Sequence, residues 1–323
     1  MVQHGTTYKS FTMIIAWLMI TFLLQTSSHI STAIATENTA VVIRSQQITA
    51  YNEAIKGFEE GCKGENISIS AVYDLKGDPD EGKRVVQTIR ENKMKPGIIL
   101  AVGVLAATLV KEQFTDIPII FCMVINYERF NLQGVNISGI SSEASLEDQF
   151  TLLRELLGPH KNVGVVYDPT KTEKIVSKAT IVAKKFDFTL VKTEVLSEKD
   201  VASALKSTVN NIDALWMIPD STVITKKSID IIPNIITENH LPIFCTSDVL
   251  VRAGALVSIS PDYAYIGIQA AQIAQTLLNN PANTSLGIRP PEKLKLTLNT
   301  QAAEIIGINR SSIQSYPDVI LYP

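Results

Sequence analysis

The chain has 323 residues, of which 46% are hydrophobic and 19% are charged, and its formal net charge is −3. This length suits two domains of about 130 to 150 residues, each with its own core. The composition excludes an intrinsically disordered chain, and the absence of a basic excess excludes nucleic acid as an expected partner.

The N-terminal segment has the three parts of a secretory signal. His4 and Lys9 precede an apolar run at residues 11–24, and Ala33-Ile34-Ala35 offers a small-x-small cleavage site. The run is shorter than the roughly 20 apolar residues of a membrane-spanning helix. We therefore expect residues 1–35 to be a signal peptide and the mature protein to be periplasmic. The alternative is an uncleaved membrane anchor.

Three cysteines are present, Cys62, Cys122 and Cys245. An odd number at wide spacing does not form a disulfide framework. Cys122 and Cys245 lie in apolar strand patterns, where a small buried thiol is the expected role. A single bridge remains open at this point.

Strand and helix patterns alternate through the first half of the mature chain. Apolar runs at 40–45, 67–73, 97–103 and 117–125 predict strands, and residues 51–63, 81–92 and 105–113 have helical spacing. Strands that alternate with helices of about 10 to 15 residues predict a parallel sheet covered on both faces.

A second round of the same kind follows. Strands are expected at 162–168, 188–195, 213–218, 241–245 and 254–260, and helices at 146–157, 172–186, 201–209, 223–232 and 263–278. The strict alternation at 294–299 predicts an edge strand or a segment that crosses a hinge. Residues 302–306 predict a short helix that ends at Gly307.

The two rounds resemble each other. Ile117-Pro-Ile-Ile-Phe-Cys122 and Leu241-Pro-Ile-Phe-Cys245 each enter a strand through an apolar-proline pair and end on Phe-Cys. We therefore predict an α/β fold with two Rossmann-like lobes, each with a parallel sheet, joined by a hinge. Lobe 1 is expected at 36–140, with part of 262–323 returning to it, and lobe 2 at 141–261.

The sequence lacks the residue patterns that are typical of a catalytic or metal-binding site. His160 and His240 are the only histidines after the signal, and neither has a partner at ligand spacing. No Gly-x-Ser-x-Gly elbow and no phosphate-binding glycine-rich loop is present. The sequence therefore predicts neither an enzyme nor a metal site nor a cofactor.

Short polar and aromatic residues gather where the predicted strands end. In open α/β sheets ligands bind beyond these carboxyl ends, where helix N-termini present N–H groups. Hydroxyl or N–H donors with an acidic group suit an amino acid or a similar zwitterion. The candidates are Ser45, Gln46, Gln47, Gly103, Asn126 and Tyr127 in lobe 1, Tyr167, Asp168, Asp220, Ser221, Thr222 and Ser247 in lobe 2, and Asp262 and Tyr263.

Several of these residues have a simpler alternative role. Asp220-Ser-Thr222 suits the N-cap of a following helix, Asp168-Pro169 suits an ordinary turn, and the ring of Tyr263 suits core packing. Asp248 is expected to be a cap. Asp220 is the strongest candidate, and Asp220→Ala is expected to weaken ligand binding about tenfold, roughly 1.4 kcal/mol, without unfolding the chain.

The second half of the chain resembles a known family. The run Arg252-Ala-Gly-Ala-Leu-Val-Ser-Ile-Ser-Pro-Asp-Tyr263, followed by Ile266-Gly267, is similar to a signature of the ABC-transporter substrate-binding family that includes tryptophan- and tyrosine-binding lipoproteins. The segments at 51–58, 117–121, 135–140 and 215–222 are similar as well, so the resemblance covers nearly the whole mature chain.

The resemblance implies a type I periplasmic binding protein that closes on a small polar, amino-acid-like ligand and delivers it to a membrane permease driven by an ATPase. It implies ligand contacts from Asp220-Ser221-Thr222 and from Gly103-Val104. Two positions depart from the family pattern: Val104 stands where Thr or Ser is frequent, and Asn126-Tyr127 where many members have Asp-Pro.

Two other functions remain open at this point. A ligand-sensing module that feeds a membrane receptor kinase would need the same cleft, and an extracytoplasmic enzyme would need a catalytic set that the sequence lacks. In the favoured interpretation, contact with the membrane is made only through the permease or an uncleaved signal.

Overall fold

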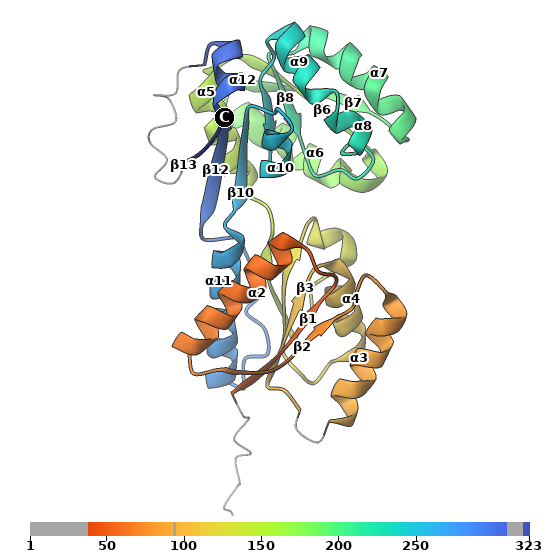
Figure 1. The fold of residues 1–323 in the computed structure, drawn as a ribbon, viewed down its shortest axis with the longest axis vertical. Helices are drawn as coiled ribbons and strands as arrows, with labels where there is room; N and C mark the ends of the chain where they lie inside the picture. Colours follow the sequence, from red (N-terminus) through yellow and green to blue (C-terminus); the bar gives the residue numbers. More distant parts are fainter. Residues whose placement is uncertain (1–37, 93–94, 309–318) are drawn as a thin grey trace, which may run out of the picture. The chain divides into compact units, whose positions relative to one another are not determined.

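The computed structural model describes residues 38–92, 95–308 and 319–323 (Figure 1). The predicted signal peptide at 1–35 lies outside these residues. The described chain forms one six-stranded and one seven-stranded sheet with interleaved helices. The predicted α/β fold with two lobes is thereby confirmed.

The first sheet has the strand order β11-β5-β4-β3-β1-β2, and all of its neighbouring strands are parallel. Its strands are β1 (Thr39–Arg44), β2 (Ser68–Asp74), β3 (Ile98–Val102), β4 (Ile119–Val124), β5 (Ile137–Ser141) and β11 (Ile288–Arg289).

Both faces of the first sheet are buried because its central strands are apolar on both sides. In β3, Ile98, Leu100 and Val102 pack in one core and Ile99 and Ala101 in the other. Helices α2 and α11 lie side by side on one face, and α3 and α4 contact each other (Figure 1). The helical elements of this lobe are α2 (Thr49–Gly64), α3 (Pro79–Glu91), α4 (Val104–Gln113), η1 (Tyr127–Phe130) and α11 (Tyr263–Asn279).

The second sheet has the order β13-β12-β10-β9-β8-β6-β7, and only the β10–β12 pair is antiparallel. Its strands are β6 (Lys161–Tyr167), β7 (Phe188–Glu194), β8 (Ala214–Met217), β9 (Ile243–Cys245), β10 (Val257–Pro261), β12 (Leu294–Asn299) and β13 (Val319–Tyr322). The expectation of an edge strand at 294–299 is wrong, because β13 pairs with the outer side of β12.

The helices of the second lobe are α5 (Leu146–Leu157), α6 (Pro169–Lys185), α7 (Glu198–Thr208), η2 (Val209–Asn211), α8 (Lys226–Ile229), α9 (Ile232–Asn239), α10 (Asp248–Arg252) and α12 (Thr300–Ile306). A single helix over 223–232 is not formed. Thr225 and Ser228 form a capping box that starts α8 three residues later, and Pro233 lies in the first turn of a separate helix, α9.

The chain passes between the two sheets three times. The passages lie between β5 and α5, between β10 and α11, and between β11 and β12. They give a basis for the predicted lobe boundaries at 140 and 261, which stay predictions. Among the described residues, no helix is both long and apolar enough to cross a membrane.

Candidate functional site

The candidate residues of the first lobe lie where β1, β3 and β4 end. Ser45 is buried, and its hydroxyl donates to the Val102 carbonyl at 3.0 Å and accepts from the Ala106 N–H at 3.0 Å. Ser45 therefore caps the N-terminus of α4 from a neighbouring strand, a role that leaves its hydroxyl engaged with backbone.

Gly103 has φ of +89° at the start of α4. A Cβ at this position would lie 2.7 Å from both the Ser45 hydroxyl and the Tyr51 ring, so the turn requires glycine for conformation and for space. Val104, next to it, is half-buried and offers no hydroxyl. Gln46 and Gln47 are exposed.

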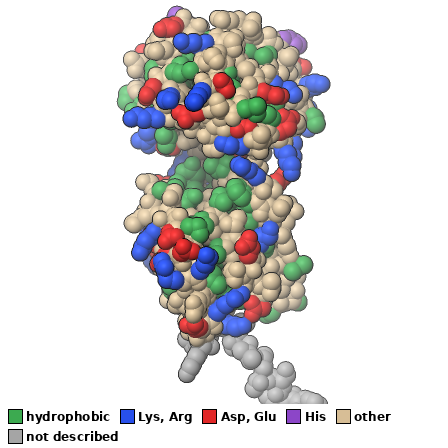
Figure 2. Space-filling model, turned by 90° about the vertical axis from the view of Figure 1, so that its right-hand side faces the viewer, with side chains coloured by type: hydrophobic (Ala, Val, Ile, Leu, Met, Phe, Trp, Pro, Cys, Tyr) green, Lys and Arg blue, Asp and Glu red, His purple; other side chains and the backbone are tan. Residues whose placement is uncertain are grey.

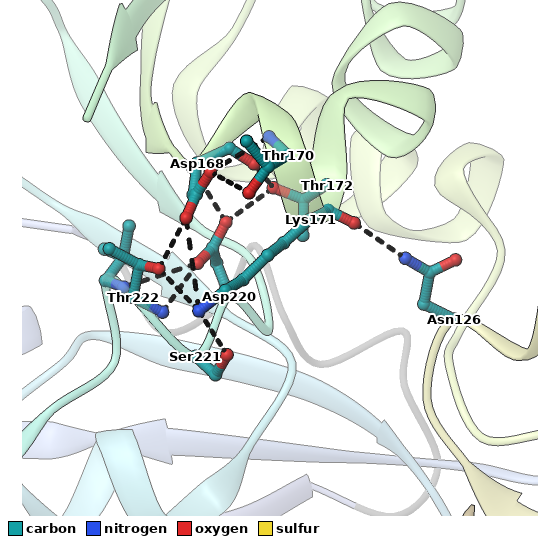
Figure 3. A network of polar contacts seen from close by, with 9 residues as sticks. Asn126, Asp168, Thr170, Lys171, Thr172, Asp220, Ser221 and Thr222 are labelled. Carbon is teal, nitrogen blue, oxygen red and sulfur yellow. Dashed lines mark hydrogen bonds and ion pairs between the residues drawn. The ribbon is translucent and has the colours of Figure 1, made fainter. Parts of the chain in front are cut away.

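A bulge at the end of β4 shapes a turn that contacts the second lobe. The register of β4 against β5 shifts between Phe121 and Val124, and Met123 and Asn126 both have positive φ, +59° and +51°. The Asn126 side-chain amide donates to the Lys171 carbonyl on α6 at 3.1 Å (Figure 3). Tyr127 follows, with its ring centroid 5.9 Å from that of Phe121.

Asp168 and Asp220, at the ends of β6 and β8, belong to one network of hydrogen bonds (Figure 3). Asp220 is 1% exposed. Its carboxylate accepts from the N–H groups of Asp168 and Thr222, each at 2.8 Å, and from the Thr172 hydroxyl at 2.6 Å. These bonds tie the turn after β8 to the start of α6.

The Asp168 carboxylate is engaged in the same way. It accepts from the Thr170 N–H at 2.9 Å and hydroxyl at 2.7 Å, and from the Thr222 hydroxyl at 2.7 Å. Desolvation alone would raise the pKa of Asp168, but these hydrogen bonds and the nearby Lys171 ammonium outweigh it, so the pKa lies below its ordinary value. Lys171 also donates to Ser221 at 2.9 Å and Thr222 at 2.6 Å.

Tyr167 lies apart from the other candidates. It is fully buried, and its hydroxyl donates toward Glu173 at 2.9 Å and Glu194 at 3.1 Å. Burial first, and then these two carboxylates, raise the pKa of Tyr167. As a ligand contact it stays a prediction.

The remaining candidates follow β9 and β10. Ser247 precedes α10 and makes no side-chain cap there, whereas Asp262 caps α11 through the Tyr265 N–H at 3.1 Å and pairs with Lys295 at 3.2 Å. Tyr263 is half-buried. Burial raises the pKa of its phenol, and the carboxylates of Asp248 and Glu53 raise it further.

A cavity of about 330 Å³ lies at the carboxyl ends of β4, β5, β8 and β9. It therefore draws on both sheets and on the passage between β5 and α5. Hydrophobic side chains gather in the hollow between the lobes on the face shown in Figure 2, whereas cationic and anionic side chains are mixed over the rest. Of the predicted residues, Asn126 and Tyr127 line the cavity.

The other lining residues include several that sequence reasoning missed, namely Glu143, Gln149, Lys174, Trp216, Thr246 and Arg289. Trp216 lies within the strand predicted at 213–218, and it is 2% exposed. Its indole N–H donates to Gln149 at 2.9 Å, and the Gln149 amide donates to the Ala144 carbonyl at 2.9 Å. This chain of bonds connects the cavity wall to the passage after β5.

Glu143 lies in that passage. Its side chain accepts from the Asn126 N–H at 3.3 Å. Desolvation is the main cause that raises the pKa of Glu143, and Glu128 adds to it, while the Asn126 hydrogen bond and Lys178 oppose it. The sequence signal was a single acidic residue between Ser141-Ser142 and Ser145.

No group of three or more His, Cys, Asp and Glu residues that could hold a metal ion occurs within residues 38–92, 95–308 and 319–323.

Two α/β lobes with mostly parallel sheets, three passages between them and a cavity at the strand ends define a type I periplasmic binding protein fold. Solved structures with this fold are similar to the chain. The ligand-free, open structure of a substrate binding protein with adhesive properties from Clostridium difficile is 21% identical, with a TM-score of 0.75, over 88% of this chain and 98% of that one. The ABC domain in complex with L-Trp from Streptococcus pneumonia is 19% identical, with a TM-score of 0.63, over 87% and 100%.

Sequence comparison identifies the family. The model of the ABC transporter substrate binding protein family matches residues 40–318, so the chain belongs to this family. A tyrosine-binding protein of Clostridioides difficile (strain R20291) is 23% identical over 277 residues, which are 81% of this chain and 79% of that protein. Family membership confirms the predicted resemblance. The chain is an extracytoplasmic substrate-binding protein that serves an ABC transporter, and it is not an enzyme.

Proposed function

We propose that the protein binds an amino-acid-like ligand in the cavity, closes its two lobes on it, and delivers it to the permease of an ABC importer. The observation that carries this proposal is the position of the cavity, whose lining comes from strand ends of both sheets. A ligand that contacts both lobes stabilises the conformation in which they are closed.

The chemistry of the lining suits a zwitterion with an apolar side chain. Trp216, Ile218 and Ile288 supply apolar surface, and the cations Lys174 and Arg289 supply donors for a carboxylate. Two of the similar proteins support an aromatic side chain, because one is named for tyrosine binding and one was solved with L-Trp.

The predicted site residues fall into two proposed roles. Asn126, Tyr127, Ser221, Ser247 and Tyr263 are proposed to contact the ligand, together with Gln46, Gln47 and Val104 on the rim of the first lobe. Ser45, Gly103, Asp168, Asp220, Thr222 and Asp262 are proposed to shape the turns that carry these contacts, because most of their polar groups are engaged within the protein.

Secretion through a signal peptide at 1–35 and a periplasmic location are part of the same proposal. The apolar run at 11–24 and the small residues at 33–35 support it.

The test is a thermal-shift screen of the protein against the twenty amino acids, nucleosides and small organic acids, followed by calorimetry of each hit. A ligand that binds the native state raises the melting temperature. We expect α-amino acids, with aromatic ones foremost, to raise it and to bind one per chain. A screen in which only nucleosides or organic acids without an amine bind would contradict the proposal.

A further inference from the structure

Among the described residues that line the cavity, Glu143 is a carboxylate without an ion pair. Glu128 forms an ion pair with Lys178 at 2.8 Å. Glu143 has no ion pair within the part of the chain that the structure describes, and the one hydrogen bond to its side chain there is the 3.3 Å bond from the Asn126 N–H. Lys174 and Arg289, which also line the cavity, have no ion pair within the same residues.

Glu143 is half-buried, and a carboxylate that is partly removed from water is destabilised unless a cation or several donors compensate it. One long hydrogen bond does not provide that compensation, and the raised pKa of Glu143 has the same physical origin. An acidic group in this condition, inside a cavity that is open to ligand, is a candidate for ligand recognition. A primary ammonium placed beside it would supply the missing charge and up to three donors.

We propose that Glu143 binds the ammonium group of the ligand, so that the cavity selects amine-bearing compounds over their deaminated counterparts. This inference rests on the proposed function, because it takes the cavity as the ligand site. The acidic residue that contacts the ligand is then Glu143, in the passage after β5, and not Asp220, which was the strongest candidate from the sequence.

A purely structural role for Glu143 makes a different prediction. If the side chain serves only to hold the turn after β4 through the Asn126 N–H, then Glu143→Gln retains that role, because the glutamine carbonyl accepts the same bond. If the side chain binds an ammonium, the same substitution removes the charge that the ligand requires. Glu143→Gln therefore separates the two roles at constant shape.

The experiment is calorimetric titration of the wild-type protein, Glu143→Gln and Glu147→Gln. The probes are L-tyrosine and L-tryptophan, with 3-(4-hydroxyphenyl)propionate and 3-(indol-3-yl)propionate as their deaminated counterparts. The wild type is expected to prefer an amino acid at least about tenfold, and Glu143→Gln is expected to abolish this preference by weakening only the amino acid. Glu147→Gln is the matched control and is expected to keep the preference, because Glu147 is exposed, lies outside the cavity lining and pairs with Lys185 at 3.7 Å.

A preference that survives in Glu143→Gln would overturn the role of Glu143 and leave the proposed function standing. Failure of every probe to bind the wild type would overturn both. Thermal melts of the variants establish that they fold.

A measurement on the wild type alone covers the case in which Glu143→Gln does not fold. An ammonium beside Glu143 favours the ionised carboxyl, so amino acid binding at mildly acidic pH releases a proton. The charged groups around Glu143 in the cavity are Glu128, Lys174, Lys178 and Arg289, and the phenol of Tyr127 is nearby. Titrations in buffers of different ionisation enthalpy measure this release, and its absence would overturn the proposal.

Discussion

Asp220 is held by the protein more completely than any other candidate residue of the site. Four hydrogen bonds reach its carboxylate, from Asp168, Thr172, Thr222 and Val223. The strand end carries Asp220 to Asp168 and Thr222, but sequence does not say whether a side chain turns toward a ligand or toward neighbouring loops. The burial of both carboxylates in one network is a property of tertiary packing.

This geometry changes the result expected for Asp220→Ala. The substitution leaves buried donors of Asp168, Thr172 and Thr222 without an acceptor, so we expect it to lower the free energy of unfolding by about 3 kcal/mol. Chemical denaturation measures the loss. Asp230→Ala, at an exposed position, is the control and should change stability by less than about 0.5 kcal/mol. Equal stability of the two variants would contradict the network.

Glu143 should make stability depend on pH in a defined direction. Its pKa is raised above 4.5 in the folded state, so between 4.5 and the raised value the folded state binds more protons than the unfolded state. The free energy of unfolding contributed by Glu143 therefore falls as pH rises through that interval. Urea denaturation of the wild type and Glu143→Gln between pH 4 and 8 tests this (about four pH units, wide enough to contain the shift). The free energy of unfolding of the wild type minus that of Glu143→Gln should become lower as pH rises. A value that becomes higher as pH rises would be inconsistent with the raised pKa.

At the scale of elements, helices α2 and α11 approach each other through glycine. A Cβ on Gly57 would overlap the Ala264 carbonyl oxygen, and a Cβ on Gly267 would overlap the Ala54 carbonyl oxygen. This contact fixes α11, which enters the first lobe directly after β10 and carries Tyr263 at its start.

Alanine at either glycine should therefore be strongly destabilising. We expect Gly57→Ala and Gly267→Ala each to cost at least about 2 kcal/mol, because backbone atoms must move apart. Gly64→Ala is the control in the same helix, because no atom lies within 4 Å of its Cβ, and it should be neutral or slightly stabilising. Thermal melting of the three variants decides the matter, and similar melting temperatures would refute the close approach.

The sequence left open whether two of the three cysteines form a disulfide. Cys62, Cys122 and Cys245 are free and buried, and burial raises the pKa of each thiol to about 12. We expect a thiol reagent to label none of them in the native protein at neutral pH, and all three after denaturation, because a buried thiol is both inaccessible and protonated. Fewer than three labelled thiols in the denatured chain would indicate a disulfide.

Sequence predicts most of these elements and fails at two for identifiable reasons. The apolar runs at 97–103 and 117–125 become β3 and β4, because buried parallel strands need apolar residues on both faces. The single helix expected at 223–232 fails because Asp220 holds the preceding turn and a new cap begins at Thr225. The position of β12 depends on its pairing with the distant β13, which no local pattern reveals.

At the scale of the whole molecule, the similarity between the two rounds of strands and helices was sufficient to predict two lobes. The cavity was harder to predict, because its lining combines strand ends of both sheets with the passage after β5 and with Arg289 of β11, which are far apart in the sequence. Glu143 and Trp216 line the same cavity only because the folded chain brings them together, and neither belongs to a local motif.

The central claim is that an amino acid binds beside Trp216 in this cavity. The chain has two tryptophans, Trp17 and Trp216, so Trp17→Phe leaves Trp216 as the sole indole reporter. Titration of this variant with L-tyrosine or L-phenylalanine, followed by the emission of Trp216, is therefore the most direct test. The account predicts a saturable change in emission at one ligand per chain, and binding heat without any change in Trp216 emission would contradict it.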